Sequence, residues 1–342
     1  MQIFTLKIVE IRKETSDTIT LCFKQPGLKK VRYLAGQYLT LIFRINGRRY
    51  IRPYSFSSAP NVDKHLEVTI KKVPNGIVSN HIHDIVKVDD SIETMSPMGN
   101  FIIPDNKDYK TIFLWGAGSG ITPLMSIAKS SLSSNPDINV NLIYGNRNKE
   151  NTIFKRDINV LQEKFTTFKP YHFYTQLSVK EQLPNIVQGR INPEKVLEII
   201  DQNSLNNSIH FICGPTGLKE SVKEILLLYS IEPENIFYED FELVKDPKDF
   251  EDIETRNINL FFNGFEHKLE IPKGKSILEV GLDAGLELPY SCQTGNCNTC
   301  KGKLKDGLMR MIGLKDIRND LSKDEFLLCC SHPLNNEVYI EI

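Results

Sequence analysis

Residues 288–302 read Leu-Pro-Tyr-Ser-Cys-Gln-Thr-Gly-Asn-Cys-Asn-Thr-Cys-Lys-Gly, so that three cysteines fall within nine residues. A further pair, Cys329 and Cys330, follows after about thirty residues, and the whole chain holds seven cysteines. The N-terminus alternates polar and apolar residues and lacks the apolar stretch of a secretory signal. Because disulfides belong to secreted proteins, this odd and closely spaced set favours metal ligation.

The spacing of the cysteines indicates which metal they bind. Cys292, Cys297 and Cys300 stand as C-x4-C-x2-C, which with one downstream thiol is the spacing of four thiolates on two irons. The alternative, structural zinc, prefers paired two-cysteine knuckles. Small and turn-forming residues between the cysteines let the loop close around a cluster. Adjacent side chains of an extended segment point in opposite directions, so only one of Cys329 and Cys330 is expected to reach the irons.

A chain of 342 residues exceeds what one hydrophobic core usually serves, so we expect more than one domain. The regions outside the cysteine cluster differ in their pattern of apolar and polar residues. Residues 1–104 carry short alternating strands at regular spacing, which predicts an antiparallel β-barrel. Residues 105–241 alternate apolar strands with helical stretches, which predicts an α/β domain with a parallel sheet. Residues 242–255 are a charged run with one proline, which is typical of a linker. Residues 256–342 form a compact unit of strands, one helix and the cysteines.

Composition narrows the function classes. Lys and Arg number 42 against 43 Asp and Glu, which argues against a nucleic-acid binder that depends on a strong positive field. No stretch approaches the roughly 20 apolar residues of a spanning helix, so membrane insertion is not expected. We therefore expect a cytoplasmic protein with a small-molecule or protein partner.

A glycine-rich segment, residues 115–123, follows an apolar strand and opens a helix, where bare N–H groups favour a phosphate. The usual dinucleotide fingerprint wants a third glycine where Ile121 stands, and a lone match is also typical of a tight strand–helix turn. Cys213 ends another strand before a Gly-Pro break, which places it at the carboxyl edge of a sheet where α/β ligands bind. A plain buried cysteine is the alternative. The candidate binding residues here are Gly116, Gly118, Gly120, Thr122, Pro123, Cys213, Gly214 and Pro215.

A second segment has the chemistry that a flavin requires. Arg52 can pair with a pyrophosphate, the flat Tyr54 can stack, and Ser55 can donate a hydrogen bond near the reactive ring nitrogen. Pro53 completes this string. His81 and His83 are interpreted as surface residues of a short helix rather than as bases, since hydride transfer needs no general base.

These strings resemble known families. Residues 288–302 and 326–333 resemble plant-type ferredoxins, of the α+β β-grasp fold, in which a proline commonly follows the last ligand by four residues. That resemblance selects Cys329 and leaves Cys330 as a buried spare. The glycine segment, the Cys-Gly-Pro break and the R-x-Y-S string resemble the ferredoxin–NADP reductase superfamily. The resemblance implies that FAD is bound by Arg52–Ser55 and by Gly76, Val78 and Ser79, that Cys213 lies beside the nicotinamide, and that Glu239 and Phe241 match a Glu-x-Phe near the flavin.

The order of the three parts resembles that of the reductase components of ring-hydroxylating oxygenases and phenylacetyl-CoA oxygenase. The resemblance implies electron transfer from NAD(P)H to FAD, then to a 2Fe-2S cluster and an oxygenase component, with Ser55, Cys213 and Glu239 at the reacting centre. A reductase for a Rieske oxygenase, a steroid hydroxylase or a fatty-acid desaturase has the same parts. A non-enzymatic 2Fe-2S carrier is the alternative of another class, and the intact flavin and nicotinamide strings oppose it.

The stretch from residue 142 to 149 bears on the choice of nicotinamide. An acid at the end of this strand would accept from the ribose 2′-hydroxyl of NADH, whereas an Arg accommodates the 2′-phosphate of NADPH. Residues 142–149 contain no Asp or Glu, and two of them, Arg147 and Lys149, are cationic. The sequence therefore predicts NADPH rather than NADH, with Arg147 as the binding residue; a solvated loop arginine is the alternative.

Overall fold

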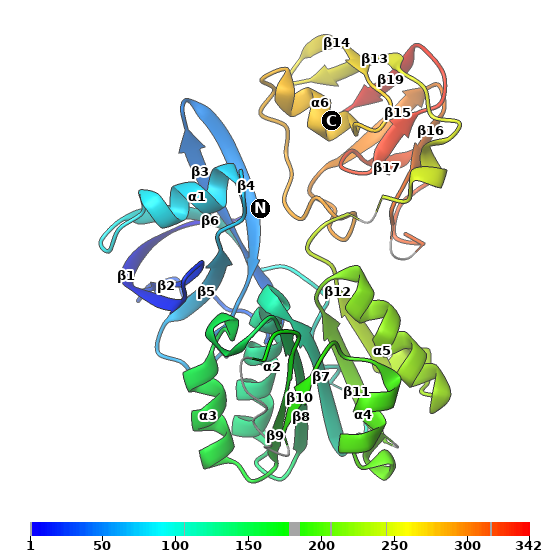
Figure 1. The fold of residues 1–342 in the computed structure, drawn as a ribbon. Coiled ribbons are helices and arrows are strands. Elements are labelled where there is room, and N and C mark those ends of the chain that lie inside the picture. Colours follow the sequence, from blue (N-terminus) through cyan, green and yellow to red (C-terminus); the bar gives the residue numbers. More distant parts are fainter. Residues whose placement is uncertain (1, 106, 178–184, 206, 244, 315–316) are drawn as a thin grey trace. The chain divides into compact units, whose positions relative to one another are not determined.

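The computed structural model describes residues 2–105, 107–177, 185–205, 207–243, 245–314 and 317–342 (Figure 1). Two compact units divide the chain, Met1–Leu41 with Tyr54–Asp240 and Ile42–Pro53 with Phe241–Ile342. No helix in the described ranges is both long and apolar enough to cross a membrane.

An antiparallel sheet forms the N-terminal part, as predicted. Its strand order is β4-β3-β6-β1-β2-β5, and Phe56, just after β4, bridges to Val68 of β5, which links the two edges of the sheet into a barrel. Inward-facing apolar residues such as Leu21, Leu39 and Val68 are fully buried. The elements are β1 (Ile3–Thr15), β2 (Thr18–Phe23), β3 (Tyr38–Ile45), β4 (Arg48–Ser55), β5 (Leu66–Lys71), α1 (Ile77–Asp84) and β6 (Ser91–Met95).

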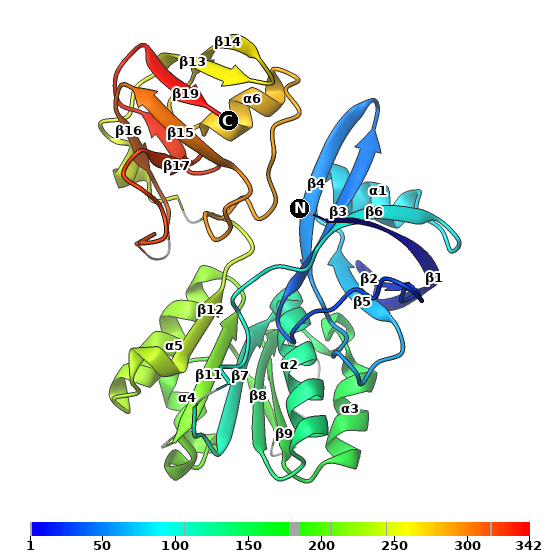
Figure 2. The same cartoon turned by 180° about the vertical axis from the view of Figure 1, so that it is seen from behind.

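A parallel sheet follows, also as predicted, in the order β10-β9-β8-β7-β11-β12. Figure 2 shows this sheet from behind. The chain starts at the central β7, builds outward to β10, and returns to the other side of β7 with β11. The strands are β7 (Thr111–Ala117), β8 (Asn139–Asn146), β9 (Phe168–Tyr174), β10 (Ile186–Gln188), β11 (Ser208–Cys213) and β12 (Ile236–Glu239).

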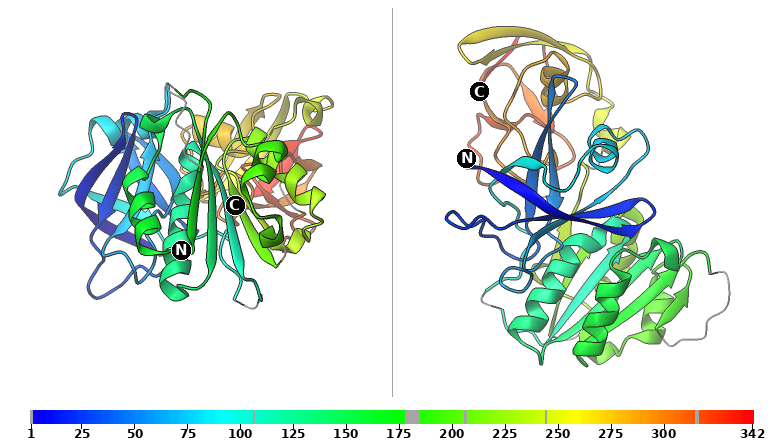
Figure 3. Two further views of the ribbon diagram at one scale, coloured as in Figure 1. Left: turned by 60° about the horizontal axis from the view of Figure 1, so that its bottom comes forward. Right: turned by 90° about the vertical axis from the view of Figure 1, so that its left-hand side faces the viewer.

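Helices cover both faces of this sheet (Figure 3). One buried cluster packs α2 (Ile121–Ser134) and α3 (Lys155–Lys164) against β7, β8 and β11, and a second packs α4 (Pro193–Ile199) and α5 (Thr216–Leu228) against the opposite face. The sheet is therefore buried on both sides, which explains why its strands are continuous apolar runs rather than alternating ones. Short 3-10 turns at Gly118–Gly120, Lys149–Asn151, Gln202–Leu205 and Pro233–Asn235 complete this part.

The C-terminal part is a mixed sheet with one helix, in line with the α+β prediction. The order β14-β13-β19-β15-β17 includes the parallel pair β13 and β19, and β16 pairs separately with β18. Ser276 and Glu279 form a reciprocal capping box that begins the helix. The elements are β13 (Arg256–Phe262), β14 (Phe265–Ile271), α6 (Ile277–Asp283), β15 (Lys301–Asp306), β16 (Met309–Met311), β17 (Glu325–Leu327), β18 (Ser331–Pro333) and β19 (Val338–Glu341).

The expected linker, residues 242–255, is more structured than its charged composition indicates. It contains a 3-10 turn at Pro247–Phe250, and Phe250 and Ile253 are buried against Ile312. Two apolar side chains three residues apart thus anchor a short turn within this run. The domain boundaries themselves stay predictions.

Candidate functional site

Three predicted residues lie side by side at one edge of the parallel sheet. Gly116 of β7 is in register with Cys213 of β11, and Cys213 is in register with Glu239 of β12. These are the carboxyl ends of the strands, and the sheet reverses its direction of growth between β7 and β11. Open α/β sheets bind their ligands outside such a switch point. The structure thus brings together the glycine segment and the Cys-Gly-Pro break that the sequence only suggested to be neighbours.

The glycine turn at this edge is held by two side chains. Tyr144 donates its hydroxyl to the carbonyl of Gly118 at 2.9 Å, and Thr122 donates to the carbonyl of Ser119 at 3.0 Å. Gly118 has a φ of +53° and faces open space, so its backbone can be approached by a ligand. Thr122 therefore shapes the turn in addition to any contact with a phosphate.

Gly120 has a different task from Gly118. A Cβ at this position would lie 2.0 Å from the carbonyl oxygen of Cys213, which no side chain tolerates. Ile121 occupies the position of the third glycine of the fingerprint, and its side chain is fully buried in the core beneath α2. No side chain caps the first turn of α2, and Pro123 fits there because it needs no N–H partner.

Cys213 is a buried thiol. Its burial, with smaller effects from Glu239 and Asp240, raises the pKa of Cys213 well above its ordinary value. The thiol stays neutral at physiological pH, so it can line a pocket but is a poor nucleophile. Gly214 and the exposed Pro215 follow it, and Pro215 is the N-cap residue of α5.

The predicted flavin string lies on β4. Ser55 is buried, whereas Arg52, Pro53 and Tyr54 are half-buried, and Arg52 donates through Nη1 to the carbonyl of Ile51 at 2.8 Å. Arg52 and Pro53 are grouped with the second compact unit, and Tyr54 and Ser55 with the first. The part of this string in the first unit thus consists of an aromatic side chain, Tyr54, followed by a buried hydroxyl, Ser55, at the end of β4.

The predicted pyrophosphate segment is the start of α1. Gly76 is its N-cap residue and makes no side-chain cap, so the first-turn N–H groups have no side-chain acceptor from that position. Val78 and Ser79 are buried, and Ser79 Oγ accepts from the Val73 N–H at 3.3 Å, which leaves its own proton for donation. An anion therefore fits these donors.

His81 and His83 do lie on this short helix, but they are half-buried rather than at the surface. His83 Nε2 is 3.0 Å from the carbonyl oxygen of Ile70, because the eight-residue helix packs closely on β5. Phe241, predicted near the flavin, is 46% exposed and belongs to the second unit.

The end of β8 is rich in positive charge. Arg147 is exposed, and its carbonyl accepts from the Gln176 N–H at 2.7 Å. On the neighbouring β9, burial lowers the pKa of His172 to about 4, and Lys155 and Lys149 lower it further. Lys149 and Lys155, which both follow β8, thus act electrostatically on His172.

The four predicted cluster ligands meet as two pairs. The thiol of Cys292 interacts most strongly with that of Cys297, and the thiol of Cys300 with that of Cys329, which also interacts with Cys330. All four are free cysteines, and the loop that carries the first three of them has left-handed residues at Gln293 and Gly295. In the described ranges, no three His, Cys, Asp or Glu side chains converge as a single metal ion would require. Two pairs of thiols are compatible with two thiolates on each of two irons.

Burial does not separate Cys329 from Cys330, since both are buried. Cys330 donates to the carbonyl of Leu327 at 3.3 Å and lies near Gly295, while also contacting the Cys329 thiol. The pairing with Cys300 is what favours Cys329 as the ligand.

The structure adds residues that the sequence reasoning missed. Arg318 donates to the carbonyl of Gly295, to the Asn298 side chain and to Asp320, so it closes over the cysteine loop from about twenty residues downstream. Tyr144, which supports the glycine turn, was also missed. A tyrosine near the carboxyl end of an otherwise apolar strand was the available signal, because a buried hydroxyl requires a partner.

Comparison with known proteins agrees with the division of the chain into three parts. Family models match in order: the oxidoreductase FAD-binding domain at residues 5–103, the oxidoreductase NAD-binding domain at residues 114–224 and the 2Fe-2S iron-sulfur cluster binding domain at residues 260–334. The chain thus carries domains for FAD, a nicotinamide nucleotide and a 2Fe-2S cluster, and the residues described above offer donors that fit each group.

Similar proteins span the whole chain. The ferredoxin reductase component of 3-ketosteroid-9-alpha-monooxygenase from Mycolicibacterium smegmatis is 31% identical, covering 99% of this chain and 96% of that protein. One of the subunits of 1,2-phenylacetyl-CoA epoxidase from Escherichia coli is 26% identical, covering 98% and 97%. The solved structure of phthalate dioxygenase reductase shares the fold, with a TM-score of 0.67 at 23% identity over 99% of this chain and 98% of that one. The chain therefore belongs to the family of iron–sulfur flavoprotein reductases that join FAD-binding, NAD-binding and 2Fe-2S domains in one polypeptide.

Proposed function

We propose that this chain is the NAD(P)H-dependent reductase of an oxygenase system and delivers electrons one at a time to an oxygenase component. The observation that carries the proposal is the alignment of Gly116, Cys213 and Glu239 at the switch point of the parallel sheet. Such an edge is where a nicotinamide nucleotide binds in α/β folds. The two thiol pairs of the C-terminal part would hold the 2Fe-2S cluster that passes single electrons onward.

The residues divide into three binding roles. Bound FAD would supply the exchange between two-electron and one-electron chemistry, which no side chain of the protein can supply. For the flavin we assign Arg52, Pro53, Tyr54 and Ser55, with Gly76, Val78 and Ser79 at its pyrophosphate. For the nucleotide we assign Gly116, Gly118, Gly120, Thr122, Pro123, Arg147, Cys213, Gly214 and Pro215.

At the reacting centre we assign three side chains. Ser55 offers a hydroxyl to the flavin ring, and the neutral Cys213 thiol packs against the nicotinamide. Glu239, in register with Cys213, lies beside the same strand end. Phe241 follows Glu239 by two residues and is assigned to the flavin side. The cluster ligands are Cys292, Cys297, Cys300 and Cys329.

For the partner we propose an oxygenase of the phenylacetyl-CoA epoxidase type, supported by likeness to a subunit of that enzyme over nearly the whole chain. A steroid monooxygenase is the second candidate, because the relative from that system is the more similar of the two, at 31% against 26%. Purified full-length protein supplied with NADPH or NADH should reduce one of these two oxygenase components and not the other.

The decisive test of the function is analysis of the purified protein. We expect one FAD, two irons and two acid-labile sulfides per chain, with NAD(P)H oxidation supporting ferricyanide reduction. Zinc in place of iron, or FMN in place of FAD, would contradict the cofactor assignment. A protein without any flavin absorbance would instead support the non-enzymatic carrier.

A further inference from the structure

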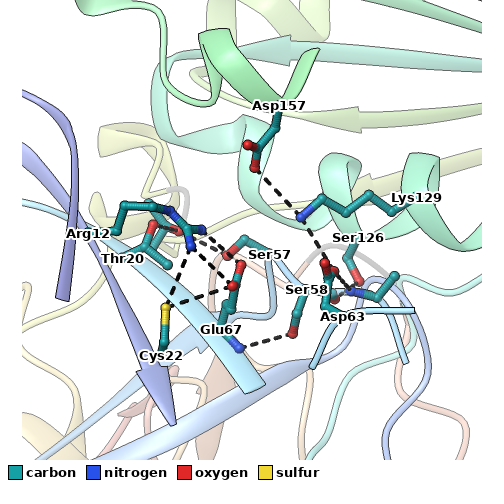
Figure 4. Close-up of polar contacts among 12 residues, drawn as sticks. Arg12, Thr20, Cys22, Ser57, Ser58, Asp63, Glu67, Ser126, Lys129 and Asp157 are labelled. Atoms are coloured by element: carbon teal, nitrogen blue, oxygen red, sulfur yellow. Dashed lines mark hydrogen bonds and ion pairs between the residues drawn. The ribbon is translucent and has the colours of Figure 1, made fainter. Parts of the chain in front are cut away.

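Helix α2 carries two polar side chains that reach the N-terminal barrel (Figure 4). Ser126, which is completely buried, donates its hydroxyl to the carbonyl of Ser58 at 2.6 Å. Lys129 lies with its ammonium 3.4 Å from a carboxylate oxygen of Asp63. Ser58 and Asp63 belong to the loop that directly follows β4, the strand of the flavin string. We call these four residues the α2 clamp.

The loop side of the clamp is firmly held. The Ser58 hydroxyl accepts from the Glu67 N–H at 3.0 Å and shares a hydrogen bond of 2.7 Å with Tyr33. The Asp63 carboxylate accepts from the Ala59 N–H at 2.7 Å. Ser58 and Asp63 are therefore held by further hydrogen bonds within their own loop and to β5. A contact from α2 to these two residues consequently fixes the helix relative to the whole loop.

A buried polar network extends behind this loop into the barrel (Figure 4). Glu67, with a side chain 10% exposed, pairs with Arg12 of β1 through two hydrogen bonds of 3.0 and 3.3 Å. Burial, with a smaller effect from Glu67, raises the pKa of Cys22 to about 12, so its thiol remains a neutral donor to Glu67. A carboxylate satisfied in this way is a rigid support, because its partners restrict it from several directions.

The helix side is tied in turn to its own domain. Lys129, with a side chain 11% exposed, also lies 3.7 Å from Asp157 of α3. Ser126 lies one helical turn beyond Thr122, which shapes the glycine turn, and residues four apart share a helix face. The 3-10 turn Gly118–Gly120 itself packs beside β5. One short stretch of α2 thus connects the nucleotide edge with the loop behind the flavin string.

We propose that Ser126 and Lys129 are positioning residues for hydride transfer. They hold the glycine turn, and the sheet edge at which Cys213 lies, in place relative to the end of β4. This inference rests on the proposed function, since it assumes that nucleotide and flavin bind on these two elements. Reactants held on separate elements react only at near-attack distance, and a misplacement of about 1 Å can cost about a hundredfold in rate. Neither side chain touches a reacting atom.

The test compares variants of the full-length protein. Ser126→Ala and Lys129→Met should slow flavin reduction after rapid anaerobic mixing with NADPH at least tenfold, with unchanged FAD content and unchanged reduction by dithionite. Ser131→Ala is the matched control, because Ser131 lies buried on the same helix and its hydroxyl has no hydrogen-bond partner in the described residues. Lys129→Arg keeps the charge and should restore most of the rate.

A second readout does not depend on the cofactors. Amides of residues 57–63 should exchange with deuterium faster in Ser126→Ala than in Ser131→Ala, because the clamp no longer holds the loop. Equal exchange, or a wild-type rate of flavin reduction in both clamp variants, would overturn the inference. A wild-type protein whose flavin neither NADPH nor NADH reduces would overturn the proposed function, and the exchange experiment would still test the clamp. If Lys129→Met does not fold, Ser126→Ala decides.

Discussion

Replacing Gly120 by Ala tests how tightly the glycine turn is packed against the strand that ends at Cys213. The backbone at Gly120 has a φ of −62°, which alanine adopts freely, so the added methyl group is the whole perturbation. It would lie 2.0 Å from the carbonyl oxygen of Cys213, against at least 3.4 Å for an ordinary contact. The two segments must therefore separate by about 1.4 Å, and overpacking of this kind costs about 1–3 kcal/mol.

We expect two consequences of that separation. The unfolding temperature of the first unit should fall by several degrees, since each kcal/mol is worth about 2–4 °C in a domain of this size. The rate of flavin reduction by NADPH should fall by about a hundredfold, because the turn and Cys213 flank the same edge. Scanning calorimetry and rapid mixing measure the two effects.

The matched control is Gly217→Ala, on the exposed second residue of α5, where an added Cβ meets no atom within 4 Å. Alanine is the better helix former by up to about 1 kcal/mol, so this variant should be unchanged or slightly stabilised. If Gly120→Ala were as stable as Gly217→Ala and reduced its flavin at the wild-type rate, the close contact with Cys213 would not exist in solution.

Three further substitutions address the other sites. Cys329→Ser should abolish the visible absorbance of the cluster while Cys330→Ser keeps it; the reverse result would exchange their roles. Arg147→Ala should lower kcat/KM for NADPH at least tenfold and barely change it for NADH, since a hydrogen bond to a charged group is worth about 1.5–3 kcal/mol; equal losses would leave Arg147 as scaffold. Arg318→Gln should speed thermal loss of the cluster by about tenfold, while Lys303→Gln, at an exposed ion pair, should not; equal rates would separate Arg318 from cluster retention.

Much of the fold and of the candidate site could be predicted because its signals are local. The C-x4-C-x2-C spacing, the continuous apolar strands and the glycine segment each lie within one short stretch, where residue type and period act directly on backbone geometry. The three family-level domains were confirmed on this basis. The domain boundaries, the individual site residues and the cytoplasmic location stay predictions.

What the sequence could not show is contact between distant segments. Nothing local indicates that Arg318 closes over the loop containing Gly295, or that Ser126 of one domain bonds to Ser58 of the other. The exposure of His83 was misjudged for the same reason, because its partner is a carbonyl of another strand. Side chains with common polar groups carry no signature of such a partner until the topology brings the two together.

The third position of the glycine fingerprint shows how topology changes the meaning of a motif. The usual interpretation treats Ile121 as a defect, because a glycine there allows close packing of helix and strand. In this chain the close approach occurs one residue earlier, at Gly120, where the Cys213 carbonyl occupies the place of a side chain. Ile121 is then free to enter the core beneath α2, where it is fully buried. The departure from the fingerprint is thus a shift of the packing contact by one residue, and Gly118 still presents its open backbone to a ligand.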